Sequence, residues 1–258
     1  MQVPPLITLT TDYGSKDYYA GLLKGCLYKL IPEASVVDIS HYINRYDIIH
    51  AAYVLKNAAF AFPAGTLHIV DINNLNDHQV DLILCEYHQQ FFVGPDNGVL
   101  YMLFEGNPEN FVVLAPDPMG LYNFNIRVSK AAKDLFDKKP LKEIGKPGEK
   151  IRERITLQPV ITRDQIRATV IHIDHYENVV LNISKSLFEK TGLGRPFELY
   201  YKRSDPITQL SRKYYDGPVG EVLCMFNEAG YLQISINMGT AASLLGLQKD
   251  TVVQIDFL

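Results

Sequence analysis

The sequence predicts two domains, an α/β domain built on a mainly parallel sheet and a smaller domain made of β-strands. Over roughly the first 140 residues, apolar β-branched runs alternate with helical patterns, which is typical of a sheet with helices on its faces. Short apolar runs separated by turn residues follow, as in a small β-barrel or sandwich. A charged connector rich in glycine and proline separates the two patterns, and we place the boundary near residue 156, between domains 1–156 and 157–258.

The expected strands of the first domain are apolar runs bounded by turn residues. They span Leu6–Thr11, Ser35–Ile39, Thr66–Val70, Leu82–Glu86, Gln90–Val93 and Phe111–Leu114. Helical spacing predicts helices over Asp17–Leu30, Asp47–Ala59 and Lys130–Phe136. The stretch Phe92–Leu100 contains Gly-Pro and Asp-Asn-Gly, and we interpret it as a hairpin because Asn-Gly accepts positive φ.

The second domain is expected to contain six short strands and one short helix. The strands span Gln165–Ile173, Val179–Ile183, Phe197–Tyr201, Glu221–Phe226, Tyr231–Ile236 and Thr251–Phe257, and the helix spans Ala241–Leu245. The turn with Asp174 and Asn178 is either a simple hairpin turn or a place where the Asn178 amide reads an adenine-like edge. The turn Asn237–Ala241 leads into the helix and exposes backbone amides that can hold a carboxylate or a base edge.

Composition excludes several classes of function. A net charge of −4 without any basic stripe argues against a nucleic-acid-binding protein. The sequence contains no run of about 20 apolar residues and no basic leader, so we expect neither a membrane span nor a signal peptide. The three cysteines lie far apart and suit free thiols in the cytoplasm. The histidines and carboxylates form no metal-binding spacing, and we expect no metal.

The segment Leu6–Gly14 carries the strongest functional signal. An apolar strand ends at Asp12 and a glycine turn, and Asp17 follows five residues later. Ligands of open α/β sheets bind at the carboxyl ends of strands. Carboxylates there suit hydroxyl groups and cations rather than phosphate, and no phosphate-binding glycine pattern is present. The alternative is that Asp12 merely ends a strand and Asp17 caps a helix.

These segments, in this order, resemble the S-adenosylmethionine hydroxide adenosyltransferases, relatives of fluorinases and chlorinases. The resemblance covers nearly the whole chain and rests on Thr10-Thr-Asp-Tyr-Gly14, Asp17 with Gly21 and Lys24-Gly25, Val37-Asp-Ile-Ser-His41, Phe62-Pro with Gly65-Thr66, Gly94-Pro-Asp-Asn-Gly98, Asp174 with Asn178, and Asn237 through Gly246. It implies a Rossmann-like first domain, a C-terminal β-barrel and a homotrimer. In that family the sites lie between the N-terminal domain of one subunit and the C-terminal domain of its neighbour.

The resemblance also implies binding roles. Asp12 is expected to hold the ribose hydroxyls, and Asp17 and Asp174 are expected to face the methionine ammonium. Asn178, together with the turn from Asn237 to Ala241, is expected to meet the adenine. S-adenosylmethionine is then the substrate, and no cofactor is implied.

The water-handling positions of the family are changed in this chain. Asp71 is retained, but His78 stands at an arginine position seven residues later and Asn125 stands at a histidine position. Glu228 occupies a serine position near the amino acid end of the substrate. An aromatic-glycine turn is altered to Tyr176-Glu177.

Two functions remain open after these changes. The favoured function is an S-adenosylmethionine hydrolase that forms adenosine and L-methionine, with catalytic positions Asp71, His78 and Asn125. His78 is either a substitute base near Asp71 or a solvated loop residue. The alternative is a non-catalytic protein that binds adenosine or S-adenosylmethionine. A halide-using relative is disfavoured because its chemistry asks for a small hydroxyl-lined pocket.

Overall fold

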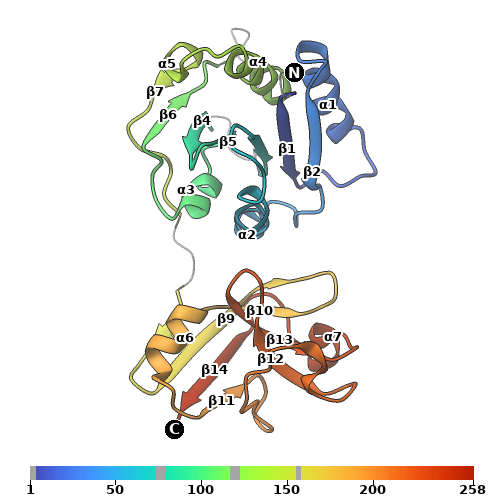
Figure 1. Cartoon of the computed structure of the whole chain (residues 1–258), viewed down its shortest axis with the longest axis vertical. Coiled ribbons are helices and arrows are strands. Elements are labelled where there is room, and N and C mark those ends of the chain that lie inside the picture. Colours follow the sequence, from blue (N-terminus) through green and yellow to red (C-terminus); the bar gives the residue numbers. More distant parts are fainter. Residues whose placement is uncertain (1–3, 74–79, 117–122, 155–157) are drawn as a thin grey trace. The chain divides into compact units, whose positions relative to one another are not determined.

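The chain divides into two units, Met1–Ile155 and Thr156–Leu258. The computed structural model in Figure 1 describes residues 4–73, 80–116, 123–154 and 158–258. The predicted domain boundary at residue 156 lies outside the described residues. Among the described residues, no helix has both the length and the apolar character needed to cross a bilayer.

The first unit is built on a seven-stranded sheet with the order β2-β1-β3-β5-β4-β6-β7. Its strands are β1 (Leu6–Thr11), β2 (Ser35–Ser40), β3 (Leu67–Asp71), β4 (Leu82–Tyr87), β5 (Gln90–Pro95), β6 (Asn110–Val113) and β7 (Lys146–Pro147). The pairs β1–β2, β1–β3 and β3–β5 are parallel. The pairs β4–β5, β4–β6 and β6–β7 are antiparallel.

The sheet is therefore mixed, and the prediction of a mainly parallel sheet is too strong. The cause is the turn between β4 and β5, in which only His88 and Gln89 join the strands. Both residues have positive φ, of 48° and 61°, as in the tight turns that connect antiparallel neighbours. A parallel neighbour would have required a much longer crossover connection.

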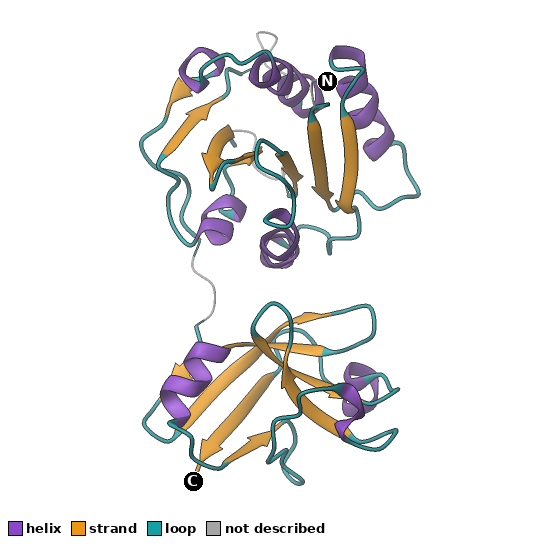
Figure 2. Ribbon diagram, viewed as in Figure 1, coloured by secondary structure: helices purple, strands orange, loops and turns teal. Residues whose placement is uncertain are grey.

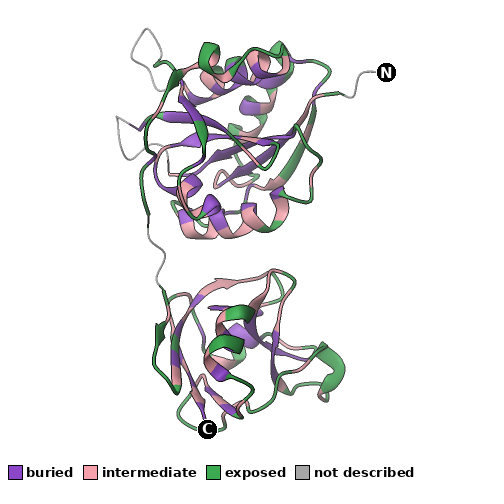
Figure 3. Cartoon of the chain, turned by 60° about the vertical axis from the view of Figure 1, so that its left-hand side comes forward, coloured by how far each residue is buried: buried purple, intermediate pink, exposed green. Residues whose placement is uncertain are grey.

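Helices cover both faces of this sheet (Figure 2). The helices α1 (Tyr19–Leu30), α4 (Phe124–Phe136) and α5 (Leu141–Ile144) pack on one face, and α2 (Ile48–Ala59) and α3 (Val99–Phe104) pack on the other. Alternate residues of β3 enter the two cores: Ile69 lies with α1 and α4, and Val70 lies with α2 and α3. The central strands are accordingly buried (Figure 3), as expected of strands covered on both sides.

Three predictions for the first unit need correction. The stretch after β5 is not a hairpin, because Gly98 leads directly into α3 with φ of 100°. Helix α4 begins at Phe124 rather than Lys130, since its buried face already starts there. Helix α1 begins at Tyr19 and has no side-chain cap, so Asp17 is not the N-cap residue.

The second unit is a curled antiparallel sheet with the order β11-β14-β9-β10-β13-β12, and β8 pairs with β9. Its strands are β8 (Val160–Ile161), β9 (Gln165–Ile173), β10 (Val179–Ser184), β11 (Phe197–Tyr200), β12 (Val222–Phe226), β13 (Tyr231–Ile236) and β14 (Val252–Phe257). Single bridges join Ile207 to Leu199 in β11 and Leu210 to Cys224 in β12. The segment between these strands therefore links both ends of the curled sheet.

This second unit is not all-β, because it also contains α6 (Lys185–Gly192) and α7 (Ala241–Leu245). The sequence predicted α7 but not α6. Ser184 caps α6 by accepting a hydrogen bond from the Leu187 amide at 3.2 Å, and a serine before an apolar run is a recognised helix start.

Candidate functional site

The carboxyl ends of β1 and β3 bring two of the predicted carboxylates together. Asp12 follows β1 directly, Asp71 is the last residue of β3, and the sheet register pairs Thr11 with Asp71. From β1 the chain passes through α1 to β2 on one side, whereas β3 lies on the other side of β1. Such a switch point is where open α/β sheets bind their ligands.

Asp71 is buried, with 1% of its surface exposed. The phenol of Tyr13 donates a hydrogen bond to its Oδ2 atom. The amide nitrogen of Asn97 donates to the carbonyl of Ile72 at 2.6 Å, which fixes the backbone immediately after Asp71. Asp96 directly precedes Asn97. Partial burial raises the pKa of the Asp96 carboxyl, although its contacts with Arg152 act in the opposite direction.

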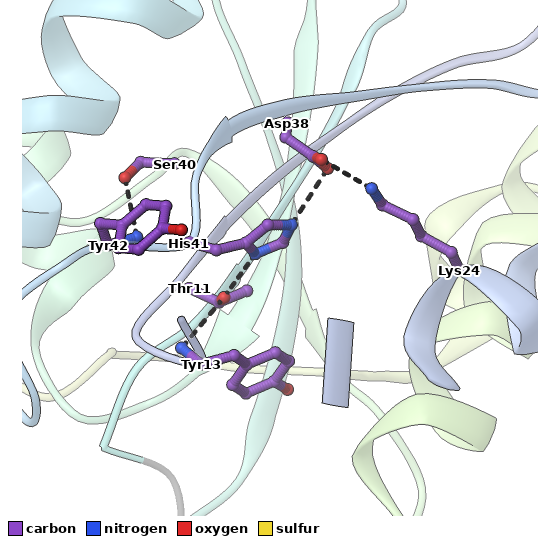
Figure 4. A network of polar contacts seen from close by, with 7 residues as sticks. All are labelled: Thr11, Tyr13, Lys24, Asp38, Ser40, His41 and Tyr42. Atoms are coloured by element: carbon purple, nitrogen blue, oxygen red, sulfur yellow. Dashed lines mark hydrogen bonds and ion pairs between the residues drawn. The ribbon is translucent and has the colours of Figure 1, made fainter. Parts of the chain in front are cut away.

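The loop after β1 is fixed to the end of β2 by a network of polar contacts (Figure 4). The Thr11 hydroxyl lies 2.7 Å from Nδ1 of His41, and it also accepts the Tyr13 amide at 3.3 Å. Nε2 of His41 lies 3.1 Å from Oδ1 of Asp38, whose other oxygen accepts a hydrogen bond from Lys24 at 2.6 Å. The loop backbone around Asp12 is therefore held by side chains from three elements.

Two of these contacts set the charge of Asp38. Partial burial raises the pKa of its carboxyl, but the hydrogen bond from Lys24 and the charges of His41 and Lys24 outweigh this effect. The resulting pKa lies below the ordinary value, so the carboxylate is the stable form near neutral pH.

Asp12 and Asp17 lie on the same loop but differ in their surroundings. Asp12 is half-buried, and its Oδ2 atom accepts the backbone amide of Tyr46 at 2.9 Å. Asp17 is exposed and lies just before α1. The loop therefore presents one anchored carboxylate and one that faces solvent.

Asn125 lies in the first turn of α4, at the same edge of the sheet. Strand β6 runs in the direction of β5 because both are antiparallel to β4, so its carboxyl end lies at this edge. Arg127 fixes the start of α4 to that end by donating to the carbonyls of Leu114 and Ala115, both at 2.9 Å. Within the described part of the chain, the buried Oδ1 atom of Asn125 has no hydrogen-bond partner. His78 lies outside the described residues.

In the second unit, the β9–β10 turn brings Asp174 and Asn178 together. Oδ1 of Asp174 accepts the backbone amides of Tyr176 and Asn178 at 2.9 and 2.8 Å, and Oδ2 accepts the Asn178 side chain at 2.8 Å. Asn178 is buried, and its amide nitrogen also lies 3.5 Å from the Tyr214 hydroxyl. The hairpin prediction is confirmed, and the same hairpin orients the predicted adenine-binding amide.

The predicted turn at Asn237 and Ala241 lies next to this hairpin, because Glu177 contacts the start of α7. Its backbone carbonyl accepts the Ala242 amide at 3.0 Å, and its carboxylate accepts the Ser243 amide at 2.9 Å. The hydrogen bonds from Ser243, but not the one from Ala242, lower the pKa of the Glu177 carboxyl. Asn237 is itself anchored by its side chain, which donates to the Gly217 carbonyl at 2.8 Å.

Glu228 does not join this group. It lies in the turn between β12 and β13, and the register pairs Tyr231, at the start of β13, with Ser184 at the end of β10. Asn178 immediately precedes the other end of β10. Within the second unit, Glu228 and the Asp174–Asn178 turn therefore lie at opposite ends of the β10–β13 pair.

Three residues that contact the predicted site residues or their neighbours have no role predicted from the sequence. Tyr13 lies in the recognised motif, but its hydrogen bond to Asp71 joins residues 58 positions apart. Tyr214 accepts a hydrogen bond from Gln233 at 2.9 Å, and its loop carries no motif. Glu177 stands where the resemblance implies glycine, and its positive φ of 62° shows why glycine suits that position.

A pocket of about 620 Å³ lies at the opposite edge of the first sheet. Its lining includes Lys56, Phe60, Tyr87, His88 and Phe104, and none of the predicted site residues contributes to it. In the described ranges, no group of three histidine, cysteine or carboxylate side chains is arranged to hold a metal ion.

Comparisons with known proteins agree across both units. The model of the SAM hydroxide adenosyltransferase N-terminal domain matches residues 7–145, and the model of the C-terminal domain matches residues 168–254. A Methanocaldococcus jannaschii protein named (R)-S-adenosyl-L-methionine hydrolase is 26% identical, over 97% of this chain and 95% of the relative. A Salinispora arenicola protein of the same name is 28% identical, over 96% of each chain.

More distant similarities extend the same pattern. A protein of an Actinoplanes species named fluorinase is 20% identical, over 97% of each chain. The crystal structure of an uncharacterised conserved protein from Thermotoga maritima superimposes with a TM-score of 0.85 at 24% identity, covering 97% of this chain and 99% of that one. This structural match supports the fold.

Proposed function

Because the chain belongs to the SAM hydroxide adenosyltransferase family, whose two domain models together match most of its length, we propose that it hydrolyses S-adenosyl-L-methionine to adenosine and L-methionine. The observation that carries this proposal is the pair of carboxylates at the switch point of the first sheet. Asp71 is buried there and Asp12 lies beside it. Carboxylates suit a cationic ligand that carries a ribose diol.

In the proposed reaction, the oxygen of a water molecule forms a bond to C5′ while the C5′–S bond breaks. The electron pair of that bond stays on sulfur, so the sulfonium becomes the neutral thioether of methionine. The water loses one proton, and we assign its acceptance to Asp71. The protein contributes mainly by aligning the water with the departing sulfur and excluding other solvent.

Asp12 is proposed to bind the ribose hydroxyls, and Asp17 and Asp174 to face the ammonium of the methionine part. Asn178 and the turn from Asn237 to Ala241 are proposed to bind adenine. The buried Asn178 amide, oriented by Asp174, supports the adenine assignment. His78 and Asn125 are proposed to contact the water. Glu228 receives no contact with this ligand, because it lies at the other end of the β10–β13 pair from Asp174.

The test is incubation of the purified protein with S-adenosylmethionine in water enriched in ¹⁸O, with adenosine followed by chromatography and mass spectrometry. We expect adenosine that carries ¹⁸O at its 5′ oxygen. Asp71→Asn is expected to lower the rate by about 10²–10⁴-fold, because it removes the proposed proton acceptor. A parallel incubation with halide distinguishes hydrolysis from halide transfer, and 5′-halogenated adenosine as the main product would contradict the proposal.

A second candidate is a protein that binds the same ligand without turning it over. It is favoured by the changes at His78 and Asn125, which replace the arginine and histidine expected at the water-handling positions. Calorimetric titration with adenosine and S-adenosylmethionine separates the two functions. Saturable binding without adenosine formation would support the non-catalytic protein, and absence of binding would exclude both.

We also propose a homotrimer in which neighbouring copies complete each binding site. Exposed aromatic side chains near both halves support this assembly, since aromatic residues are enriched at protein interfaces. Tyr18 and Tyr42 are each 69% exposed in the loops around Asp12 and Asp17, and Tyr176 is 75% exposed beside Asp174. Light scattering on the purified protein should give three times the chain mass of 29.2 kDa.

We also propose that the protein is located in the cytoplasm and holds no resident cofactor. The free thiols Cys26, Cys85 and Cys224 suit a reducing compartment. Burial raises the pKa of Cys85 and also that of Cys224, the latter to about 12, so both remain protonated and unreactive.

A further inference from the structure

Tyr13 connects the loop after β1 to the buried carboxylate at the end of β3. Its phenol donates a hydrogen bond to Oδ2 of Asp71. The two residues are neighbours because Thr11 pairs with Asp71 in the sheet and Tyr13 follows two positions later. Tyr13 is half-buried and lies in the loop after β1, next to Asp12.

The position of Tyr13 is set by the network in Figure 4. Its backbone amide donates to the Thr11 hydroxyl, and the next amide, of Gly14, donates to the carbonyl of His41 at 2.7 Å. The Tyr13 ring also lies parallel to the His41 imidazole, with an interplanar angle of 3° and a centroid distance of 6.5 Å. Both the backbone and the ring of Tyr13 are therefore held against the end of β2.

The Thr11 hydroxyl joins the imidazole of His41 to the loop. It shares a hydrogen bond with Nδ1 of His41, and its oxygen accepts the Tyr13 amide. Nε2 of His41 lies 3.1 Å from Oδ1 of Asp38 as an ion-pair contact, and it makes no hydrogen bond with a described residue. The contacts are therefore continuous from Asp38 through His41 and Thr11 to Tyr13, which favours a single loop conformation.

A carboxylate that aligns water needs a donor that holds its plane. In this chain, the arginine and histidine expected near Asp71 are replaced by His78 and Asn125, whereas the Tyr13 phenol does donate to Asp71. We infer that Tyr13 is a positioning residue that orients Asp71 for attack by water, and that the Thr11–His41–Asp38 network holds Tyr13 in place. This inference rests on the proposed hydrolase function.

The test compares Tyr13→Phe with the wild-type protein and with Tyr28→Phe, which removes the same hydroxyl from an exposed position on α1. Removal of a hydrogen bond to a charged group predicts that kcat for adenosine formation falls about 10- to 100-fold in Tyr13→Phe. The KM and the calorimetric Kd for S-adenosylmethionine should stay within about twofold, because Tyr13 acts through Asp71. Tyr28→Phe should match the wild type in all three quantities.

A double-mutant cycle identifies the route of the effect. In an Asp71→Asn background, assayed at high protein concentration, Tyr13→Phe should change the remaining rate by less than about twofold. Wild-type kcat retained in Tyr13→Phe would overturn this inference alone, as would a parallel loss of affinity and thermal stability. A wild-type protein that forms no adenosine would overturn the proposed function, and this inference with it.

Discussion

The imidazole of His68 is enclosed in the sheet of the first unit, away from the proposed site. Its Nδ1 atom lies 2.7 Å from the Thr8 hydroxyl, and its Nε2 atom lies 3.2 Å from Oε1 of Gln90. The Gln90 amide nitrogen donates to two backbone carbonyls, of Ala59 and Phe62, so Oε1 faces the imidazole as an acceptor. This arrangement requires a proton on Nε2 of His68.

Burial lowers the pKa of His68 to about 4, from an ordinary value of 6.5. A group whose pKa is lower in the folded state binds its proton more readily after unfolding. The stabilisation is therefore complete above pH 6.5 and is lost as the pH falls from 6.5 towards 4. We expect the free energy of unfolding to fall by about 2 kcal/mol between pH 7 and pH 5 because of this residue.

Urea unfolding at the two pH values measures this effect, with His68→Gln as the comparison. The change in the free energy of unfolding with pH is subtracted between the two proteins. This difference removes the contribution of groups such as Asp38, whose lowered pKa affects stability only near and below pH 3.8. The same pH dependence in both proteins would show that His68 does not titrate on unfolding.

Among single residues, the sequence could identify those that lie directly at strand ends, such as Asp12 and Asp71. Their chemistry follows from the strand pattern and the motif in which they lie. The role of Tyr13 could not be derived, because its partner lies 58 residues away and the contact depends on sheet register. The separation of Glu228 from Asn178 likewise depends on how β10 pairs with β13.

Among the elements, the turn between β5 and α3 leaves little room for a larger side chain at Gly98. Gly98 has φ of 100°, and a Cβ atom there would lie 2.1 Å from Cγ and 2.8 Å from Cβ of Arg154. Asn97 accepts the Val99 amide at 3.2 Å and so helps to begin α3. The turn joins the strand next to β3 to the helix layer opposite α1 and α4.

Gly98→Ala is expected to destabilise the protein by about 2 kcal/mol or more, since it adds both backbone strain and a steric clash. Thermal and urea unfolding measure the loss. Gly106→Ala is the matched control, because Gly106 has no atom within 4 Å of the added Cβ and no positive φ. Equal stability of the two variants would contradict this account of the turn.

The sequence predicted most of these elements correctly, because long apolar runs and helical spacing are local signals. It missed α3 since Asp-Asn-Gly suits a hairpin as well as a helix start, and only the partners of Gly98 and Asn97 decide between them. The direction of β4 also escaped prediction, because His88 and Gln89 adopt positive φ without the usual glycine.

For the whole molecule, the notable property is that each unit has its own apolar core. One core cluster draws on residues from Ile166 to Phe257, and two others draw on residues from Ile7 to Ile151. A segment of about 100 residues with its own core is long enough to fold alone.

We therefore predict that residues 158–258, expressed alone, unfold cooperatively on heating. Circular dichroism measures the transition, with the full chain as the reference for β content. A broad transition without a baseline, together with weak β signal, would show that the second unit needs the rest of the protein to fold.

The pairing of Thr11 with Asp71 has a consequence for folding kinetics. The β4–β5 hairpin closes through two residues, whereas β1 finds β3 only after about 60 residues of chain have been brought together. The carboxylate pair therefore exists only after this slow, non-local step. A ligand that needs both Asp12 and Asp71 will bind the completed sheet alone, so it should slow unfolding and leave the early steps of refolding unchanged.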